Sequence, residues 1–296
     1  MSTDRVTALA RWEGAGDTAR ARSARTRPGS GRAWLAMWAL AVAWSLGMWL
    51  ADGPVLNASG WPLVLEFFSA VLEPELSAGF LARIGSATLT TLSFAVLGTL
   101  AAVAVGLVAG VLTSETWWAA EAGSRGHRAA RRVGWLSARL ALALPRGVHE
   151  AVWALLLLSV LGRDPLVGIL AIAIPFGAIT AKVYAEILDE VPSRPYRALR
   201  EAGVGRLPAL AYAVLPAAAP DLVSYAFYRF ECAVRSAVIL GMVGAGGLGF
   251  ELALSFAGAR HGEVWTLLFV LVLVGAVVDR WGASVRRAGT PLSGRG

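Results

Sequence analysis

The chain has 296 residues, of which 56% are hydrophobic and only 16% are charged, and its formal net charge is +7. An ordinary soluble domain has about 25% charged residues, so this chain has too few charges to cover the surface of a soluble fold of its size. The composition therefore excludes a soluble domain and predicts an integral membrane protein.

Residues 1–32 are rich in arginine and precede an apolar run. Because arginines are retained on the cytoplasmic side of a membrane, we expect this segment to be a mobile, basic cytoplasmic tail. A tail that binds nucleic acid is the alternative interpretation. A signal peptide is not expected, because the arginine-bearing region is too long and no small-residue cleavage site follows the apolar run.

Apolar runs of about 20 residues predict membrane-spanning helices. The first is Trp34–Ala51, within a region that we place at residues 33–84. In the same region, Trp61–Leu72 has apolar residues at helical spacing and predicts a short helix in the outer interface. The second span is Gly85–Leu112, and the arginine-rich loop Thr113–Val133 is expected inside.

The third expected span, Gly134–Leu161, is interrupted by Pro145 and carries four polar groups, namely Arg139, Arg146, His149 and Glu150. Groups of this kind at membrane depth face protein, a water-filled cavity or an interface. Arg146 and Glu150 have i,i+4 spacing, which favours a structural ion pair over a role in transport.

The fourth span is Leu166–Leu188, and we expect Lys182 and Glu186 to pair near its cytoplasmic end. A polar inside loop over residues 189–207 and a fifth span over residues 208–231 follow. The stretch Val234–Leu254 either crosses the membrane or dips in and returns, and its glycines favour the re-entrant form.

Val264–Trp281 is the last span. Six spans place every arginine cluster and both termini in the cytoplasm, with a core at residues 85–287 and a C-terminal tail at residues 288–296. On this topology Arg22, Arg128 and Arg200 are cytoplasmic, whereas Glu66 and Arg163 are outside.

Several chemistries are excluded by residue type. Cys232 is the single cysteine, so a disulfide within the chain and a cysteine-rich metal site are not expected. The three histidines have no metal-ligand spacing, and Lys182, the one lysine, is not flanked by the glycine and hydroxyl residue of a P-loop. We therefore expect no cofactor, no metal and no ATP hydrolysis by this chain.

The inside loop contains a signature with a structural meaning. It runs from Arg197 through Ala198, Leu199, Arg200, Glu201 and Ala202 to Gly203, and Leu215-Pro216 follows after a spacer. This arrangement resembles the "EAA" signature of the permease subunits of bacterial ABC importers, with Arg197 at the position that is usually Glu. In physical terms, Gly203 permits a break where a short cytoplasmic helix ends.

A second stretch carries a more specific resemblance. Ser224–Glu231, Val234–Ala237 and Gly241–Gly249, together with His149–Ala154, are similar to the permease of phosphonate ABC importers. The resemblance covers roughly residues 133–287. It implies an all-α type I permease fold of about six spans in the bacterial inner membrane, and alternating access as the mechanism.

The resemblance also implies partners and a substrate class. The partners are a second copy of the chain, two separate ATPase subunits and a periplasmic or lipid-anchored binding protein. The ATPases would dock on the coupling segment, which consists of Arg197, Ala198, Arg200, Glu201, Ala202 and Gly203. The substrate would be a phosphonate, phosphite, hypophosphite or phosphate, since selectivity would lie mainly in the binding protein.

The sequence Gly244-Ala245-Gly246-Gly247-Leu248-Gly249 matches a dinucleotide-binding pattern, but no strand is expected before it. We interpret Gly244, Gly246, Gly247 and Gly249 as a tight turn, or gate, between two half-helices. Backbone N–H groups of such a turn that touch an anion are a second interpretation.

Five residues are candidates for the substrate path: Glu150, Arg229, Glu231, Arg235 and Ser236. Glu231 and Arg235 have i,i+4 spacing, so they form either a structural ion pair or a weak anion site in which Glu231 tempers the charge of Arg235.

Three alternative functions remain open on sequence grounds. They are a membrane-embedded enzyme that uses His149, Glu150 and Arg235, a secondary transporter, and an ABC permease of the same fold for another small solute. A neighbouring gene for a P-loop ATPase would discriminate the first two from an importer subunit.

Overall fold

A computed structural model describes residues 28–51, 60–118 and 125–289, and all regular elements in these ranges are helices. The chain forms two units, residues 1–65 and 66–296. The first contains α2, Pro28–Ala51, and the beginning of α3, Trp61–Ser69. Three expected segments lie wholly or partly outside the described residues. They are most of the basic tail (residues 1–27), part of the inside loop (119–124) and most of the C-terminal tail (290–296).

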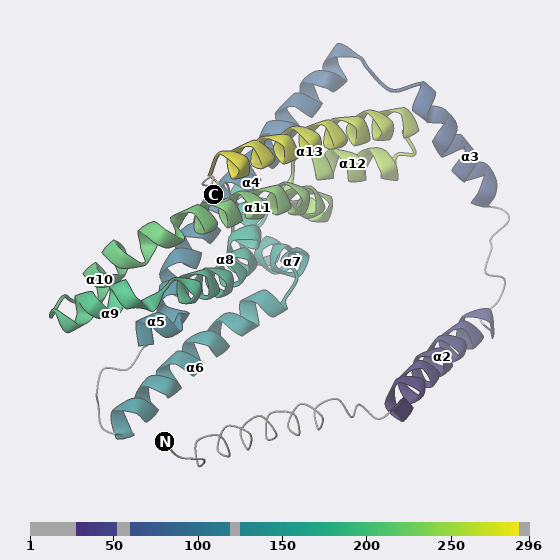
Figure 1. The fold of residues 1–296 in the computed structure, drawn as a ribbon. Helices are drawn as coiled ribbons and strands as arrows, with labels where there is room; N and C mark the ends of the chain where they lie inside the picture. The colour runs from purple at the N-terminus through teal and green to yellow at the C-terminus, as the bar shows by residue number, and fades with distance from the viewer. Residues whose placement is uncertain (1–27, 52–59, 119–124, 290–296) are drawn as a thin grey trace, which may run out of the picture. The chain divides into compact units, whose positions relative to one another are not determined.

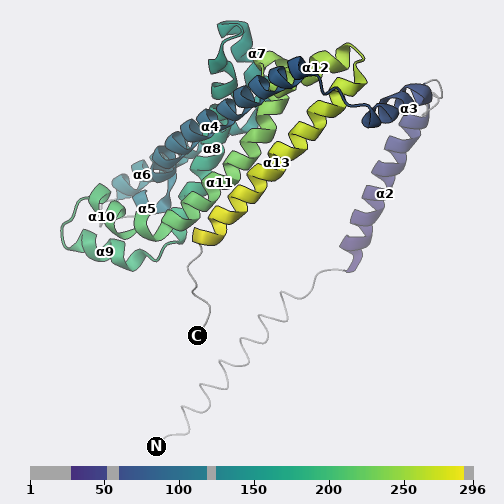
Figure 2. The same cartoon turned by 90° about the horizontal axis from the view of Figure 1, so that it is seen from above.

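The second unit is built around α4, Ala78–Thr113, and α8, Pro165–Glu190, which pack side by side (Figures 1 and 2). Three glycines of α4 make this close approach possible. A Cβ atom at Gly98, Gly106 or Gly110 would overlap side-chain atoms of α8, those of Ile172, Thr180 and Tyr184 respectively. Small residues of this kind allow two helix backbones to meet closely in a membrane.

Two of the expected spans are broken helices. α6, Arg125–Gly147, and α7, Glu150–Leu161, meet at 83°, and α10, Arg206–Ala213, and α11, Leu215–Leu240, meet at 67°. Pro145 was expected to interrupt the third span, but it lies within α6 and the break falls after Gly147. His149 caps α7, because its Nδ1 accepts a hydrogen bond of 3.2 Å from the backbone N–H of Ala151.

The fifth span ends later than the sequence predicts, and the stretch that follows it is not a separate segment. α11 continues without a break through Glu231 and Val234 to Leu240, then passes through a π-helical turn, η3, Gly241–Ala245, into α12, Leu248–Ala257. A helix of ten residues is about 15 Å long, half of what a bilayer requires. The stretch Val234–Leu254 is therefore the end of α11 followed by a short returning helix, and it is not a separate crossing.

α13, His261–Gly289, completes the unit. Among the described residues, four helices are long and apolar enough to cross a membrane, and six crossings result if each bent pair counts as one span. The expected six-span, all-α membrane fold is thus confirmed. α3 and its extension η2, Ala70–Leu72, form the expected short helix, which is tied to α13 by a 2.7 Å hydrogen bond from Trp265 Nε1 to the Phe67 carbonyl.

Candidate functional site

The short helix in the expected inside loop is α9, Ser193–Glu201, and it ends as the sequence predicts. The backbone N–H of Gly203 donates to the Arg200 carbonyl at 3.1 Å, and that of Val204 donates to the Leu199 carbonyl at 3.0 Å. This pair of bonds is a Schellman motif, which requires a left-handed residue after the helix. Gly203 has φ +84°, which L side chains rarely adopt, so glycine at this position is a structural requirement.

α9 is held to the membrane helices by one buried ring and leaves its other side open. Tyr196 packs among Tyr184 and Leu188 of α8 and Leu210 of α10. Burial raises the pKa of the Tyr196 phenol, and the nearby Arg206 guanidinium opposes that rise. Most of the expected coupling residues are exposed, namely Arg197, Ala198, Glu201, Ala202 and Gly203. The arrangement is a short helix with one anchored side and one exposed, charged side.

The glycine-rich segment is a tight turn between α11 and α12. Gly244, Gly246 and Gly247 all have positive φ, at +118°, +104° and +75°. A Cβ atom at Gly249 would overlap the Val238 carbonyl oxygen, so the turn folds directly against α11. The segment follows a helix, which is not the strand–turn–helix setting of a dinucleotide site. The structure thus has a tight turn here, between the long helix α11 and the short helix α12, and the role of the turn as a gate stays a prediction.

The expected ion pair between Glu231 and Arg235 is wrong, because each residue finds its partner on α13. Arg286 Nη1 contacts Glu231 Oε1 at 2.5 Å, and Arg235 Nη2 lies 3.0 Å from Asp279 Oδ1. The two pairs differ in exposure. The Glu231 side chain is 11% exposed, whereas that of Arg235 is 63% exposed. Glu231 is therefore nearly buried in its ion pair, and Arg235 is the one that faces open space.

The expected ion pair between Arg146 and Glu150 is also wrong. The 83° bend between α6 and α7 separates the two residues, so their i,i+4 spacing is not helical. Glu150 instead accepts a 2.7 Å hydrogen bond from Ser236 Oγ on α11, and its other oxygen lies 3.7 Å from His149 Nε2. Two predicted path residues that are far apart in sequence, Glu150 and Ser236, are thus in direct contact.

Arg229 occupies a different environment from Arg235. Its Nε and Nη2 donate to the Tyr225 hydroxyl at 2.8 and 2.6 Å, and its guanidinium stacks over the Phe176 ring of α8, 5.1 Å from the centroid. The two arginines are six residues apart, which is 240° around a helix, so they lie on different faces of α11. The five predicted path residues do not form one cluster.

The sequence analysis missed Asp279 and Arg286 as partners of α11. Their separations from Arg235 and Glu231 are 44 and 55 residues, so no local spacing indicates the contacts. The available signal was an acidic residue, Asp279, at the end of an apolar run, because a charge in that setting needs a partner.

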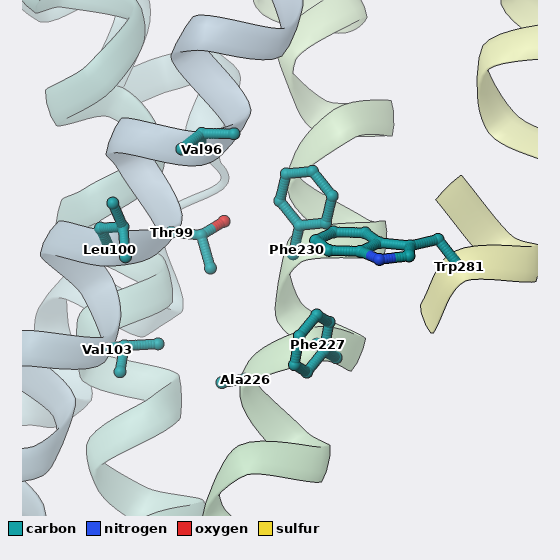
Figure 3. Close-up of a pocket in the computed structure, with 8 residues that line it drawn as sticks. All are labelled: Val96, Thr99, Leu100, Val103, Ala226, Phe227, Phe230 and Trp281. Carbon is teal, nitrogen blue, oxygen red and sulfur yellow. The ribbon is translucent and has the colours of Figure 1, made fainter. Parts of the chain in front are cut away.

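An apolar groove of about 280 Å³ runs between α4, α11 and α13. Figure 3 shows Thr99 reaching from α4 toward Phe230 on α11, with the Trp281 ring of α13 against Phe230. The lining is almost entirely hydrocarbon, which cannot replace the hydration shell of an anion. This groove is therefore not a path for a charged solute.

Residues 116–288 match a protein-family model described as "Binding-protein-dependent transport system inner membrane component". That range contains α9, the glycine turn and all five predicted path residues.

Curated relatives agree with this match. The phosphite transport system permease protein PtxC of Stutzerimonas stutzeri is 29% identical over 84% of both chains. The phosphate-import permease protein PhnE of Mycolicibacterium smegmatis is 28% identical over 79% of this chain, and HtxE of Stutzerimonas stutzeri is 33% identical over 52% of it. The chain spans 42% of PhnE and 59% of HtxE, which is less than two thirds of either protein.

One solved structure shows the fold. It is a chain of the MetNI methionine ABC transporter in an inward-facing conformation, and it superposes with a TM-score of 0.62 at 21% sequence identity. The superposition covers 73% of this chain and all of the MetNI chain. The architecture is that of a type I ABC importer permease.

Proposed function

We propose that this chain, which belongs to the family of binding-protein-dependent transport system inner membrane components, is the permease subunit of an ATP-driven importer. Its substrate in this proposal is a phosphorus oxyanion. The observation that carries the substrate class is the similarity to PtxC, because it extends over 84% of both chains and PtxC is named for phosphite transport. Phosphite, phosphate and phosphonates share a tetrahedral, negatively charged phosphorus centre.

The energy for transport comes from a separate ATPase in this proposal. α9 supports the assignment, because it carries the exposed Arg194, Arg197 and Glu201 on a helix that is anchored by Tyr196. An ATPase that docks on α9 would move it as one body, since the Schellman motif fixes the end of the helix. α9 is joined through α10 to α11, so its motion is passed to Arg235 and Ser236.

The orientation that we propose places α9, the C-terminal end of α8 and the start of α6 in the cytoplasm. Figure 2 shows α9, α10 and the short helix α5, Glu115–Trp118, at one end of the second unit and α7 and α12 at the other. The positive-inside rule favours the α9 end as cytoplasmic, because this end carries Arg194, Arg197 and Arg200. Arg163, in the turn between α7 and α8, then lies outside.

The substrate path in this proposal includes Arg235, Ser236 and Glu150. An anion loses hydration as it crosses the membrane and needs donors or positive charge in return. Arg235 is exposed and its neighbour Asp279 neutralises part of its charge, which keeps the attraction weak enough for release. Asp279 thus takes the tempering role that the sequence suggested for Glu231. Arg229 and Glu231 are held by Tyr225 and Arg286, and we assign them structural roles.

The proposed assembly is a homodimer of this chain with two ATPase subunits and a substrate-binding protein. Reconstitution of the purified permease with these partners in liposomes tests the proposal. Uptake of labelled phosphite, phosphate and a phosphonate is measured with and without ATP and binding protein. We expect uptake of at least one of these ions that requires both. Uptake that needs neither, or import of another solute class alone, would contradict the proposal.

A further inference from the structure

A second, smaller cavity lies between α6, α8 and the end of α4. Its volume is about 80 Å³, and three of its lining residues are cationic: Arg139 and Arg146 of α6, and Lys182 of α8. Thr113, Leu142 and Ala185 complete the lining. We call it the cationic cavity. It is on the α6 side of the bend at His149, and it shares no residue with the contact between Glu150 and Ser236.

The charges around the cationic cavity do not balance. Arg139 and Arg146 are seven residues apart, which places them on the same face of α6. Lys182 lies 3.6 Å from Glu186. In the described part of the chain, no other carboxylate forms an ion pair with Arg139, Arg146 or Lys182. Three positive groups and one negative group leave a net charge of +2 at the cavity.

Arg139 is half-buried, whereas Arg146 and Lys182 are exposed. Positive side chains that line one cavity repel one another, and a bound anion would relieve that repulsion. The lining is also prepared for a planar or tetrahedral anion. The Arg139 guanidinium stacks on the Trp135 ring at 4.3 Å, so its donor edge is held in a fixed orientation. Two arginine forks and one ammonium provide the donor set that proteins use for phosphate.

The size of the cavity selects among anions. At about 30 Å³ for each water molecule in the liquid, the space corresponds to between two and three waters. A space of this size suits a single phosphate group, and because Arg146 and Lys182 are exposed it is partly open to the surroundings. A dianion also matches the excess charge of +2, which a single carboxylate would leave half compensated.

We propose that the cationic cavity binds a phosphate group, supplied either as a free phosphorus oxyanion or as the headgroup of an anionic phospholipid. This site is distinct from the path residues Arg235 and Ser236, and it does not depend on which solute the chain transports. The cavity lies beside the C-terminal end of α4 and the last turns of α8. On the proposed orientation this is the cytoplasmic side, where either a lipid headgroup or a free anion could reach it.

Thermal unfolding of the full chain in nanodiscs tests the proposal. The free-ion arm uses zwitterionic phosphatidylcholine and compares inorganic phosphate with chloride at equal ionic strength. The lipid arm adds phosphatidylglycerol without phosphate. We expect at least one addition to raise the unfolding temperature of the parent. A shift with inorganic phosphate identifies a free oxyanion as the source, and a shift with phosphatidylglycerol alone identifies a lipid headgroup.

Two variants, Arg139→Gln and Arg146→Gln, should lose the rise in unfolding temperature that the anion causes. Arg146→Lys keeps the positive charge, so it should retain part of that rise. Arg131→Gln is the matched control, because Arg131 is on the same helix and does not line the cavity. In plain phosphatidylcholine, Arg146→Gln should be at least as stable as the parent, since it removes like-charge repulsion. The proposal is overturned if neither addition stabilises the parent, or if Arg131→Gln abolishes the shift as fully as Arg146→Gln.

Discussion

Ser236 Oγ on α11 donates a 2.7 Å hydrogen bond to Glu150 Oε1, the first residue of α7. The bond connects the bend between α6 and α7 to the helix that leads back, through α10, to α9. The Glu150 side chain is only 15% exposed, and the bond satisfies one of its two oxygens. The bond therefore ties α11 directly to the start of α7.

Ser236→Ala should destabilise the protein, because a hydrogen bond to a charged group contributes about 1.5–3 kcal/mol. We expect a lower thermal unfolding temperature in detergent and reduced uptake. Ser224→Ala, an equivalent change earlier on α11, is the control and should leave both unchanged. If Ser236→Ala unfolds at the parent temperature, the bond does not hold α7 in place.

Gly282→Ala should be destabilising, whereas Gly275→Ala on the same helix should not. A Cβ atom at Gly282 would overlap Glu231 Oε1, which must then leave its ion pair with Arg286. Nothing lies within 4 Å of a Cβ at Gly275, so alanine there gains up to about 1 kcal/mol of helix propensity. Unfolding temperatures of the two variants provide the comparison, and equal values would remove the argument for a close contact between Glu231 and α13.

Gly203→Val should uncouple ATP hydrolysis from uptake while the protein still inserts and dimerises. A side chain at φ +84° costs about 1–2 kcal/mol, so the Schellman end of α9 unwinds and the helix loses rigidity. Gly203→Asn should be milder, because asparagine tolerates this conformation. Gly205→Ala is the control, since Gly205 has ordinary backbone and its Cβ would make only a 3.5 Å contact with Pro208. Coupled uptake in the valine variant would contradict the role of α9.

Arg235→Ala should strongly reduce uptake and leave substrate binding by the separate binding protein unchanged. Arg235→Lys keeps the charge but loses the fork of donors, so partial uptake is expected. The double variant Asp279→Asn/Arg235→Ala distinguishes transport from structure. It removes both members of the 3.0 Å pair. Full uptake in the double variant would mean that the pair only joins α11 to α13.

Cysteine labelling tests the orientation, in a Cys232→Ser background. A cysteine at Arg163 should react with a membrane-impermeant reagent from outside, and one at Arg194 should react only from inside. Both positions are exposed, so access is set by the side of the membrane. Labelling of position 163 from inside alone would mean that the six-span topology is wrong.

The sequence predicts the helices and the turns well, because these depend on local patterns. The end of α9 at Gly203 and the positive φ values at Gly244, Gly246 and Gly247 follow from glycine placement alone. Ion pairing was predicted correctly only where both partners are on one unbroken helix, as with Lys182 and Glu186 at 3.6 Å.

The remaining contacts depend on how distant helices pack. Glu231 and Arg235 have the spacing of a pair, yet α13 offers each a better partner. The position of the bend also decides pairing. A break two residues after Pro145 is enough to separate Arg146 from Glu150, and the sequence marks the proline rather than the break.

The glycine face of α4 has a consequence for how the protein is made. Its packing partner is α8, whose last residue, Glu190, leaves the ribosome long after Thr113. α4 is therefore made before the helix against which Gly98, Gly106 and Gly110 pack. The central helix pair can thus form only after α6 and α7, which lie between its two members in the chain, have been made.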